Sequence, residues 1–332
     1  MTIVGLDVGY SNLKIAVGEA GAAPRVIVRP AGAAPLERLG ERIGAGATTS
    51  GHPQDAIVVT VDGQRWATAI EPARLEGWQR PLHADYATTP AYRALVVAAL
   101  VLADRPVVDR LVTGLPVEQA RDARRREALR RALLGRHLTE RGEVEVGEVR
   151  IVPQPVGAFV DLLWSDLDGE TLTRIEEGTV VVLDAGYYSF DWAVVVAGEL
   201  RRIASGTSLE AMSVLLERAA ALIAEQHGGR AQPLALEAAL RQQREHLFVL
   251  GRRVALPPLL ERAAAEVAGV ALEALRQALR REATNVDLVV VAGGGGSLYG
   301  PLASALFPGA EVRLARDPVG ANARGFFRYG QR

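Results

Sequence analysis

Two stretches of the 332-residue sequence share one pattern and decide the fold: Asp7-Val8-Gly9-Tyr10-Ser11-Asn12-Leu13-Lys14 and Leu183-Asp184-Ala185-Gly186-Tyr187-Tyr188-Ser189-Phe190-Asp191. In each stretch an apolar run ends at an aspartate, a glycine follows two residues later, and a second apolar run begins after a short turn. We expect each stretch to join two strands, Thr2–Asp7 with Leu13–Gly18 and Gly178–Asp184 with Phe190–Ala197. A pattern that returns about half a chain later indicates a duplicated domain.

Segments typical of strands and of helices alternate along the rest of the chain, which favours an α/β fold. Asp62-Gly63 between two apolar runs predicts a hairpin with a type I′ turn, and the Gly- and Ala-rich stretch from Pro30 to Pro53 is expected to be a loop. The other expected strands are Arg25–Arg29, Ile57–Val61, Gln64–Ala69, Arg110–Thr113, Glu143–Val152 and Asp287–Ala292. The expected helices are Tyr92–Ala103, Glu118–Leu134, Val156–Trp164, Leu209–Gln226 with a C-cap at Gly228, Leu234–Leu247, Pro258–Arg281 and one that begins near Val319.

The composition narrows the class of protein. The length suggests two domains, each large enough for its own core. The 38 basic and 39 acidic residues nearly cancel, so the charge does not favour direct contact with nucleic acid or an anionic membrane. The absence of cysteine excludes a disulfide scaffold and a cysteine nucleophile. We see no signal-peptide pattern and no apolar run of membrane-spanning length, and therefore expect a cytoplasmic protein.

The two aspartate turns carry residues suited to a metal-bound phosphate. Asp7 and Asp184 end their strands and can hold Mg²⁺ directly or through water. Gly9 and Gly186 let the backbone approach a phosphate closely, and Lys14 can add a positive charge. A plain hairpin with polar turn residues is the structural alternative for either turn alone. Facing each other, the two turns would clamp a polyphosphate and its metal from both sides.

Three further segments are candidates for the same site. Gly293-Gly294-Gly295-Gly296-Ser297 joins a buried strand to a helix, so a flat ring or a phosphate can lie against bare backbone at the helix N-terminus; the alternative is a flexible turn. Gln154 stands where a strand passes into a helix, and its amide can orient a water for attack on a γ-phosphate. A lone glutamine is more often a surface or capping residue. The small residues of Asp317–Gly325 predict a tightly packed final helix.

The order and spacing of these segments resemble the actin-like ATPase fold, a duplicated ribonuclease H-like α/β fold. The strongest resemblance is to the bacterial ParM/StbA group of plasmid-segregation actins and its archaeal and PRTRC-type relatives, which Thr113–Pro116 and Ala321–Gly325 also resemble. The resemblance implies two domains around a central nucleotide cleft. Domain I would span 1–155, with a small variable subdomain at about 25–85, and domain II would span 156–310, with a helical subdomain at about 207–281. Residues 311–332 would form a C-terminal helix that returns to domain I.

The resemblance also implies the roles of individual residues. ATP or ADP would bind with Mg²⁺, which Asp7 and Asp184 would hold, and the catalytic residues would be Asp184 and Gln154, the latter positioning the attacking water. Tyr187-Tyr188 depart from the small hydroxyl residues common in the family, and two aromatic rings could narrow the γ-phosphate pocket or change the hydrolysis rate. The implied nucleotide contacts are Gly9, Tyr10, Ser11, Asn12, Lys14, Gly186, Tyr187, Tyr188, Gly293, Gly294, Gly295 and Ser297.

The activity that this resemblance implies is ATP hydrolysis coupled to polymerisation into filaments. The partners would be further copies of the chain and a DNA-binding adaptor protein for plasmid or other DNA segregation, with no membrane and no direct nucleic acid contact. A small-molecule kinase on the same fold is one alternative, although we find no obvious acidic residue for an acceptor hydroxyl apart from the two metal-site aspartates. A nucleotide-dependent scaffold that does not polymerise is the other.

Overall fold

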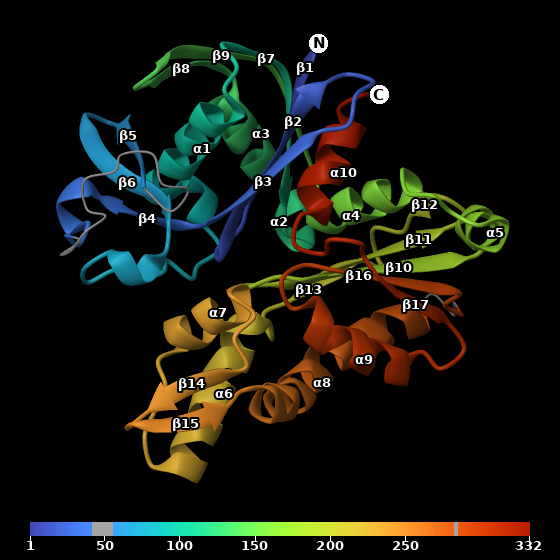
Figure 1. Ribbon diagram of the computed structural model, residues 1–332. Helices are drawn as coiled ribbons and strands as arrows, with labels where there is room; N and C mark the ends of the chain where they lie inside the picture. The colour runs from blue at the N-terminus through green and yellow to red at the C-terminus, as the bar shows by residue number, and fades with distance from the viewer. Residues whose placement is uncertain (42–55, 282–284) are drawn as a thin grey trace. The chain divides into compact units, whose positions relative to one another are not determined.

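The computed structural model describes residues 1–41, 56–281 and 285–332 (Figure 1). Contacts divide the chain into two compact units. The first unit comprises Met1–Leu115, Gln119–Val152 and Ala323–Arg332, and the second comprises Pro116–Glu118 and Pro153–Asn322. The domain limits that the family pattern implies at residues 155 and 310 stay predictions. In the described residues no helix is both long and apolar enough to cross a bilayer.

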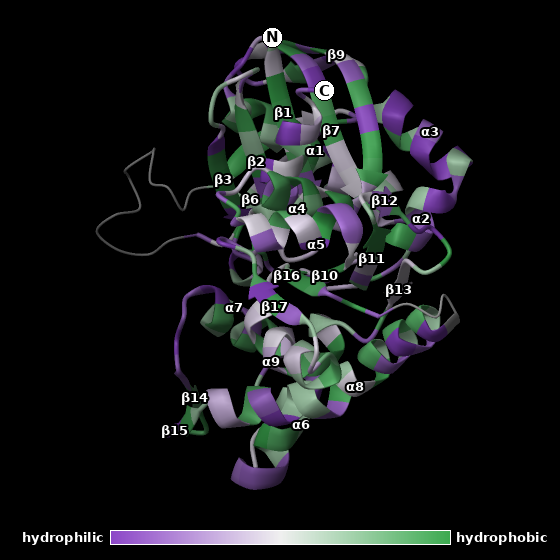
Figure 2. Ribbon diagram, turned by 90° about the vertical axis from the view of Figure 1, so that its right-hand side faces the viewer, coloured by the Kyte–Doolittle hydropathy of each residue, from purple (hydrophilic) through white to green (hydrophobic). Residues whose placement is uncertain are grey.

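The first unit is built on a six-stranded sheet with β1 near its centre. In spatial order its strands are β3 (Arg25–Pro30), β2 (Asn12–Glu19), β1 (Thr2–Val8), β7 (Val107–Leu115), β9 (Gly142–Pro153) and β8 (Gly135–Thr139). The strand β1 pairs antiparallel with β2 and parallel with β7, and nearly all of it is buried, as its unbroken apolar run predicts. Hydrophobic and hydrophilic residues alternate along β9, which is buried on one face only (Figure 2).

Helices cover both faces of this sheet. Val4 and Leu6 of β1 pack in the same core as α1 (Pro90–Ala103), whose first turn is capped by the hydroxyl of Thr89. The residues of β1 that alternate with Val4 and Leu6 face α10 (Ala321–Tyr329). Gly5 shows how closely α10 approaches, since an added Cβ there would clash with the carbonyl oxygen of Ala323 and stand 2.5 Å from the backbone nitrogen of Phe327. The helix expected over Glu118–Leu134 is two helices, α2 (Val117–Arg121) and α3 (Ala123–Leu133), since Asp122 caps a new helix with its side chain.

A second, three-stranded sheet completes the first unit in the order β4 (Gly32–Pro35), β6 (Gln64–Ile70), β5 (Ile57–Val61). The expected type I′ hairpin is confirmed, because Asp62 and Gly63 between β5 and β6 both have positive φ. The loop expected from Pro30 to Pro53 is wrong over two elements, β4 and the short helix η1 (Leu36–Arg38). The small residues of β4 allow it to pair with β6 at close range. Positions 42–53 of the expected loop lie outside the described residues. Two further 3₁₀ turns are η2 (Pro72–Arg74) and η3 (Tyr86–Thr88).

The sheet of the second unit repeats the arrangement of the first. Its strands run β12 (Glu199–Leu200), β11 (Phe190–Val196), β10 (Thr179–Ala185), β16 (Leu288–Ala292) and β17 (Glu311–Leu314), and β13 (Gly206–Ser208) also pairs with β11. As β1 does with β2 and β7, β10 pairs antiparallel with β11 and parallel with β16. The duplicated strand-turn-strand arrangement expected from the sequence is therefore confirmed.

Each face of this second sheet carries its own helices. Val180 and Val182 of β10 pack in a core with α4 (Gln154–Leu163) and α5 (Gly169–Glu177). Val181 and Leu183 point to the other face, where α6 (Met212–His227), α8 (Pro257–Arg281) and α9 (Gly296–Leu306) build the largest core. The helix α6 ends at Gly228 in the left-handed conformation, as expected.

Two expectations for the second unit are wrong. The helix expected at Leu234–Leu247 ends at Arg241 as α7 (Pro233–Arg241), and the following chain forms the hairpin β14 (His246–Val249) and β15 (Arg252–Ala255) inside the segment expected to be helical. Leu250 and Gly251 make the turn of this hairpin with positive φ angles. The C-terminal segment 311–332 also begins with a strand, β17, which pairs with β16 before α10 starts at Ala321.

Candidate functional site

The two aspartate turns have the same geometry. Asp7 lies opposite Lys14 across the β1–β2 pair, and Asp184 lies opposite Asp191 at the equivalent place of the β10–β11 pair. Each turn is closed by the same bond, from the amide of Gly9 to the carbonyl of Asn12 at 3.0 Å and from Gly186 to Ser189 at 3.1 Å. The turns differ in the residue that faces the aspartate, which is a cation in the first and a carboxylate in the second.

In the first turn a buried carboxylate is paired with a lysine. Asp7 is only 2% exposed, and its Oδ2 lies 2.9 Å from the Nζ of Lys14. A Cβ on Gly9 would stand 2.9 Å from the same Nζ, so glycine leaves the room that the ammonium group occupies. Because this pair is desolvated, each partner depends on the other or on a ligand that replaces it.

The side chain of Tyr10 fastens the first turn to the chain before α1. Its ring stacks on Tyr86 with 4.3 Å between the centroids, and its hydroxyl donates to the carbonyl of His83 at 2.8 Å. Tyr92 meets Tyr86 edge to face, and burial raises the pKa of Tyr92. The ring of Tyr10 thus has a structural task, and the nucleotide contact that the sequence predicts for Tyr10 stays a prediction.

In the second turn Asp191 is a buried anchor. Its carboxylate accepts hydrogen bonds from the hydroxyl of Ser189 at 2.5 Å, from the hydroxyl of Thr207 and from the amide of Val117 at 2.8 Å. Burial raises the pKa of Asp191, although these hydrogen bonds oppose the rise. Sequence reasoning placed Asp191 at the turn but did not find Thr207 or Val117, which come from other parts of the chain.

The N-terminus of α6 also holds the second turn. The amides of Met212 and Ser213 donate to the carbonyls of Gly186 and Tyr187 at 3.2 and 2.8 Å. The half-buried Tyr187 packs against the core beneath α6. The effect of Tyr187 on a phosphate pocket stays a prediction.

The glycine-rich segment lies directly beside the second turn. Because β10 and β16 are parallel and Asp184 pairs with Ala292, the two loops leave the sheet at the same edge. The amide of Gly295 donates to the carbonyl of Ala185 at 2.9 Å. Gly293 has a φ of +85°, and a Cβ there would stand 2.6 Å from Oδ1 of Asp184. Gly294 is exposed, and nothing lies within 4 Å of the place its Cβ would take.

One residue of this site was interpreted from the sequence only as packing. The side-chain amide of Asn322 donates to Oδ2 of Asp184 at 2.7 Å, and its oxygen accepts from the amide of Ala158 in α4 at 3.1 Å. Asn322 is 4% exposed and stands between two alanines. The sequence offers one signal for this role. Asn322 has a polar side chain at a core position of a helix made of small residues, and a buried polar side chain requires hydrogen-bond partners.

The structure thus brings most of the predicted residues of the second unit together around one carboxylate. Asp184, Gly186 and the segment Gly293–Gly295 are neighbours, and the helix that begins with Gln154 is joined to Asp184 through Asn322. Ser297 is exposed in the first turn of α9. In the first unit, the predicted residues from Asp7 to Lys14 form one hairpin turn and its flanks.

The residues present fit a metal that arrives with phosphate. In the part of the chain that the structure describes, no cluster of three or more His, Asp or Glu side chains could hold a metal ion by itself. Mg²⁺ commonly binds through one or two carboxylates and completes its shell with phosphate oxygens and water. The buried carboxylates of Asp7 and Asp184, each beside a glycine turn, match that donor set.

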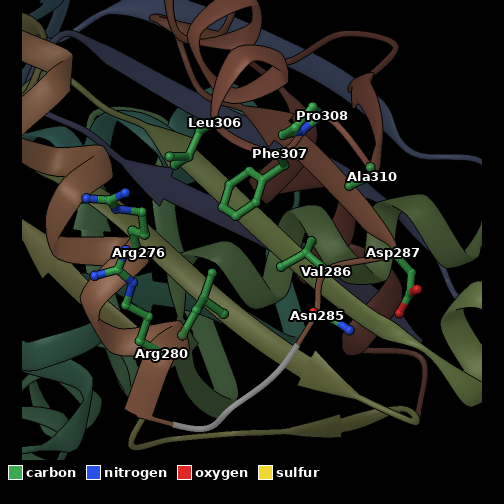
Figure 3. A pocket seen from close by; sticks show the side chains of 11 residues that line it. Arg276, Arg280, Asn285, Val286, Asp287, Leu306, Phe307, Pro308 and Ala310 are labelled. Carbon is green, nitrogen blue, oxygen red and sulfur yellow. The ribbon is translucent and has the colours of Figure 1, made fainter.

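A cavity of about 720 Å³ lies elsewhere in the second unit (Figure 3). Arg276 and Arg280 at the end of α8, Phe307 after α9 and Asp287 before β16 are among the residues that line it. None of the site residues predicted from the sequence lines this cavity.

Family models identify the class of protein that these turns and sheets define. The model described as the N-terminal domain of actin-like proteins matches residues 5–157, and the model described as the C-terminal part of the archaeal actin homologue MreB-like matches residues 182–302. Together they cover most of the chain. The chain is an actin-like protein, and the resemblance inferred from the sequence is confirmed.

Solved structures show the same fold at low sequence identity. The chain is similar to the archaeal actin homologue Ta0583 in complex with ADP, with a TM-score of 0.74, 21% identity and 99% of each chain covered. It is similar to a ParM in a 15-stranded filament from Clostridium botulinum, with a TM-score of 0.73, 15% identity and 99% of each chain covered. It is also similar to Bacillus thuringiensis ParM with AMPPNP, with a TM-score of 0.66, 13% identity and coverage of 99% and 98%. No curated protein matches the sequence.

Proposed function

We propose that this actin-like protein is a Mg²⁺-dependent ATPase that binds one nucleotide through both aspartate turns and assembles into nucleotide-dependent filaments. The observation that carries the proposal is the equivalence of the turns, each of which presents a buried carboxylate at the same register of a strand pair. The ADP and AMPPNP complexes of two structural relatives support the choice of an adenine nucleotide.

The proposal gives each turn a defined task. Lys14 neutralises Asp7 at 2.9 Å, and a phosphate would take over the ammonium group and leave the carboxylate for the metal. Asp184 would hold the same metal from the second unit, while the amides of both turns would bind phosphate oxygens. Bound Mg²⁺ would neutralise charge on the phosphates. The exposed backbone at Gly294 would lie against the adenosine.

Filament formation and its use are the finer part of the proposal. Relatives of the same fold have been solved as filaments, a 15-stranded ParM and Alp12, which supports self-association. We propose that the filaments segregate plasmid or other DNA in the cytoplasm through a DNA-binding adaptor. The near-zero net charge of −1 favours indirect rather than direct contact with DNA.

The test measures phosphate release and sedimentation of the purified chain with Mg²⁺ and ATP, AMPPNP or no nucleotide. We expect phosphate release without any acceptor molecule, and pelleting that requires ATP or AMPPNP. Release that appears only when an acceptor is added would favour a kinase. Pelleting with negligible release would favour a nucleotide-dependent scaffold, and release without pelleting in any state would refute filament formation.

Gln154→Ala should slow hydrolysis much more than it weakens nucleotide binding. An amide that orients the attacking water acts on the chemical step, so we expect kcat to fall about 100-fold with a nearly unchanged Kd. Single-turnover phosphate release and titration with a fluorescent nucleotide measure the two effects. Gln277→Ala, on α8, is the matched control. Equal losses in kcat and affinity would show that Gln154 has only a structural role.

A further inference from the structure

The chain passes between the two units at places that lie within or beside the first turns of helices. It enters the second unit between Val152 and Pro153, directly before α4, and leaves it between Asn322 and Ala323, in the first turn of α10. A short excursion, Pro116–Glu118, also belongs to the second unit while the chain on both sides belongs to the first.

One amide group connects two of these crossings to the aspartate of the second turn. The side chain of Asn322 donates to Oδ2 of Asp184 at 2.7 Å and accepts from the amide of Ala158 at 3.1 Å. All three residues are buried, with exposures of 4%, 6% and 1%. Water therefore does not replace these bonds readily, and a partner left alone in this place is costly.

The short excursion Pro116–Glu118, which makes the other two crossings, is held by the other carboxylate of the same hairpin. The amide of Val117 donates to Asp191 at 2.8 Å, and the amide of Glu118 donates to the hydroxyl of Thr207 at 3.2 Å, which itself donates to Asp191. Each crossing is thus tied by a side chain to the strand pair β10–β11, at Asp184 or at Asp191.

The two bonds of Asn322 require a side chain that both donates and accepts, as an amide does. The same planar group must donate to a carboxylate on one side and accept from a backbone amide on the other, which aspartate and leucine cannot do. Oδ1 of Asp184 borders Gly293, so that the carboxylate is confined on both sides. Asn322 therefore helps to fix the direction in which Asp184 points.

We propose that Asn322 is a positioning residue for hydrolysis, which holds Asp184 and α4, the helix that begins with Gln154, in one fixed arrangement. The inference rests on the proposed function, because it takes Asp184 as the metal-binding carboxylate and Gln154 as the residue that orients water. When nucleotide binding moves the carboxylate of Asp184, the side-chain amide of Asn322 transmits this movement to α4 and α10, the two helices that begin at the crossings.

Asn322→Leu tests this proposal, because leucine resembles asparagine in shape but makes neither hydrogen bond. We expect kcat to fall about 10- to 100-fold, as is usual when the partner of a metal-binding side chain is removed. We also expect the Mg²⁺ concentration needed for half-maximal nucleotide binding to rise by about the same factor, while nucleotide binding without Mg²⁺ stays the same. Thr171→Val is the control, since it also replaces a fully buried polar side chain of the second unit by an apolar one of similar shape, but in α5.

A second measurement separates positioning from a general loss of stability. In a Gln154→Ala background, Asn322→Leu should lower kcat clearly less than it does alone, because both substitutions remove the same placement of water. An unchanged Mg²⁺ dependence in Asn322→Leu, or effects that multiply fully in the double variant, would overturn the proposal. A wild-type chain that binds Mg²⁺ and nucleotide but releases no phosphate would refute the proposed ATPase instead, and the Mg²⁺ dependence would still decide the role of Asn322.

Discussion

Replacing Asp184 with alanine is expected to abolish ATP hydrolysis in a chain that remains folded. The proposed site has one carboxylate in the second unit to hold the metal, and removal of such a preorganised charged group should lower kcat about 10³-fold or more. The substitution also leaves the amide of Asn322 without its acceptor, which should lower the free energy of unfolding by about 1–3 kcal/mol. Phosphate release and denaturant unfolding measure the two effects.

Asp287→Ala is the matched control for this prediction. Asp287 stands immediately before β16, at the end of the strand away from the glycine-rich segment, and its carboxylate accepts from the amide of Thr179 at 2.7 Å. Its loss should lower stability by a similar amount but leave hydrolysis intact. An Asp184→Ala chain that turns over ATP at the wild-type rate would remove Asp184 from the mechanism.

Gly293→Ala should damage both stability and nucleotide binding. Gly293 has a φ of +85°, and an added Cβ would stand 2.5 Å from the carbonyl oxygen of Ala185 and 2.6 Å from Oδ1 of Asp184. Backbone strain and overpacking together should lower the free energy of unfolding by about 3 kcal/mol or more. Because the displaced group is the carboxylate of Asp184, we also expect nucleotide affinity to fall about 10-fold or more when Mg²⁺ is present.

The neighbouring Gly294→Ala separates the two parts of that expectation. Gly294 has no positive φ and nothing within 4 Å of its added Cβ, so its stability should remain within about 0.5 kcal/mol of the wild type. Thermal unfolding of both variants, with and without nucleotide, makes the comparison. A Gly293→Ala chain as stable as Gly294→Ala would show that the loop does not have the described conformation.

The features predicted correctly from the sequence are those that local patterns determine. The apolar runs before Asp7 and Asp184 are central strands buried on both faces, and such strands need an unbroken apolar sequence. The type I′ turn at Asp62-Gly63 and the left-handed C-cap at Gly228 depend on the conformational freedom of the residues themselves. The duplication of the strand-turn-strand unit was also visible, because each copy is determined by a local pattern.

Most of the features that were missed depend on partners far away in the chain. The strand β4 is made of small residues and exists because β6 pairs with it. The strand β17 forms only against β16. The hairpin β14–β15 is local, and it was missed because the expected helix Leu234–Leu247 extended over the start of β14. The role of Asn322 rests on a carboxylate 138 positions earlier, which no local pattern could indicate.

The central claim is that Asp7 and Asp184 hold one and the same metal-bound nucleotide. A structure of the chain determined with Mg²⁺ and AMPPNP at saturating concentration tests it most directly. We expect a single nucleotide whose metal and phosphates are contacted by both aspartate turns, with Lys14 moved from Asp7 to a phosphate. A nucleotide held by only one of the two turns, or two turns that bind no nucleotide at saturation, would contradict the account.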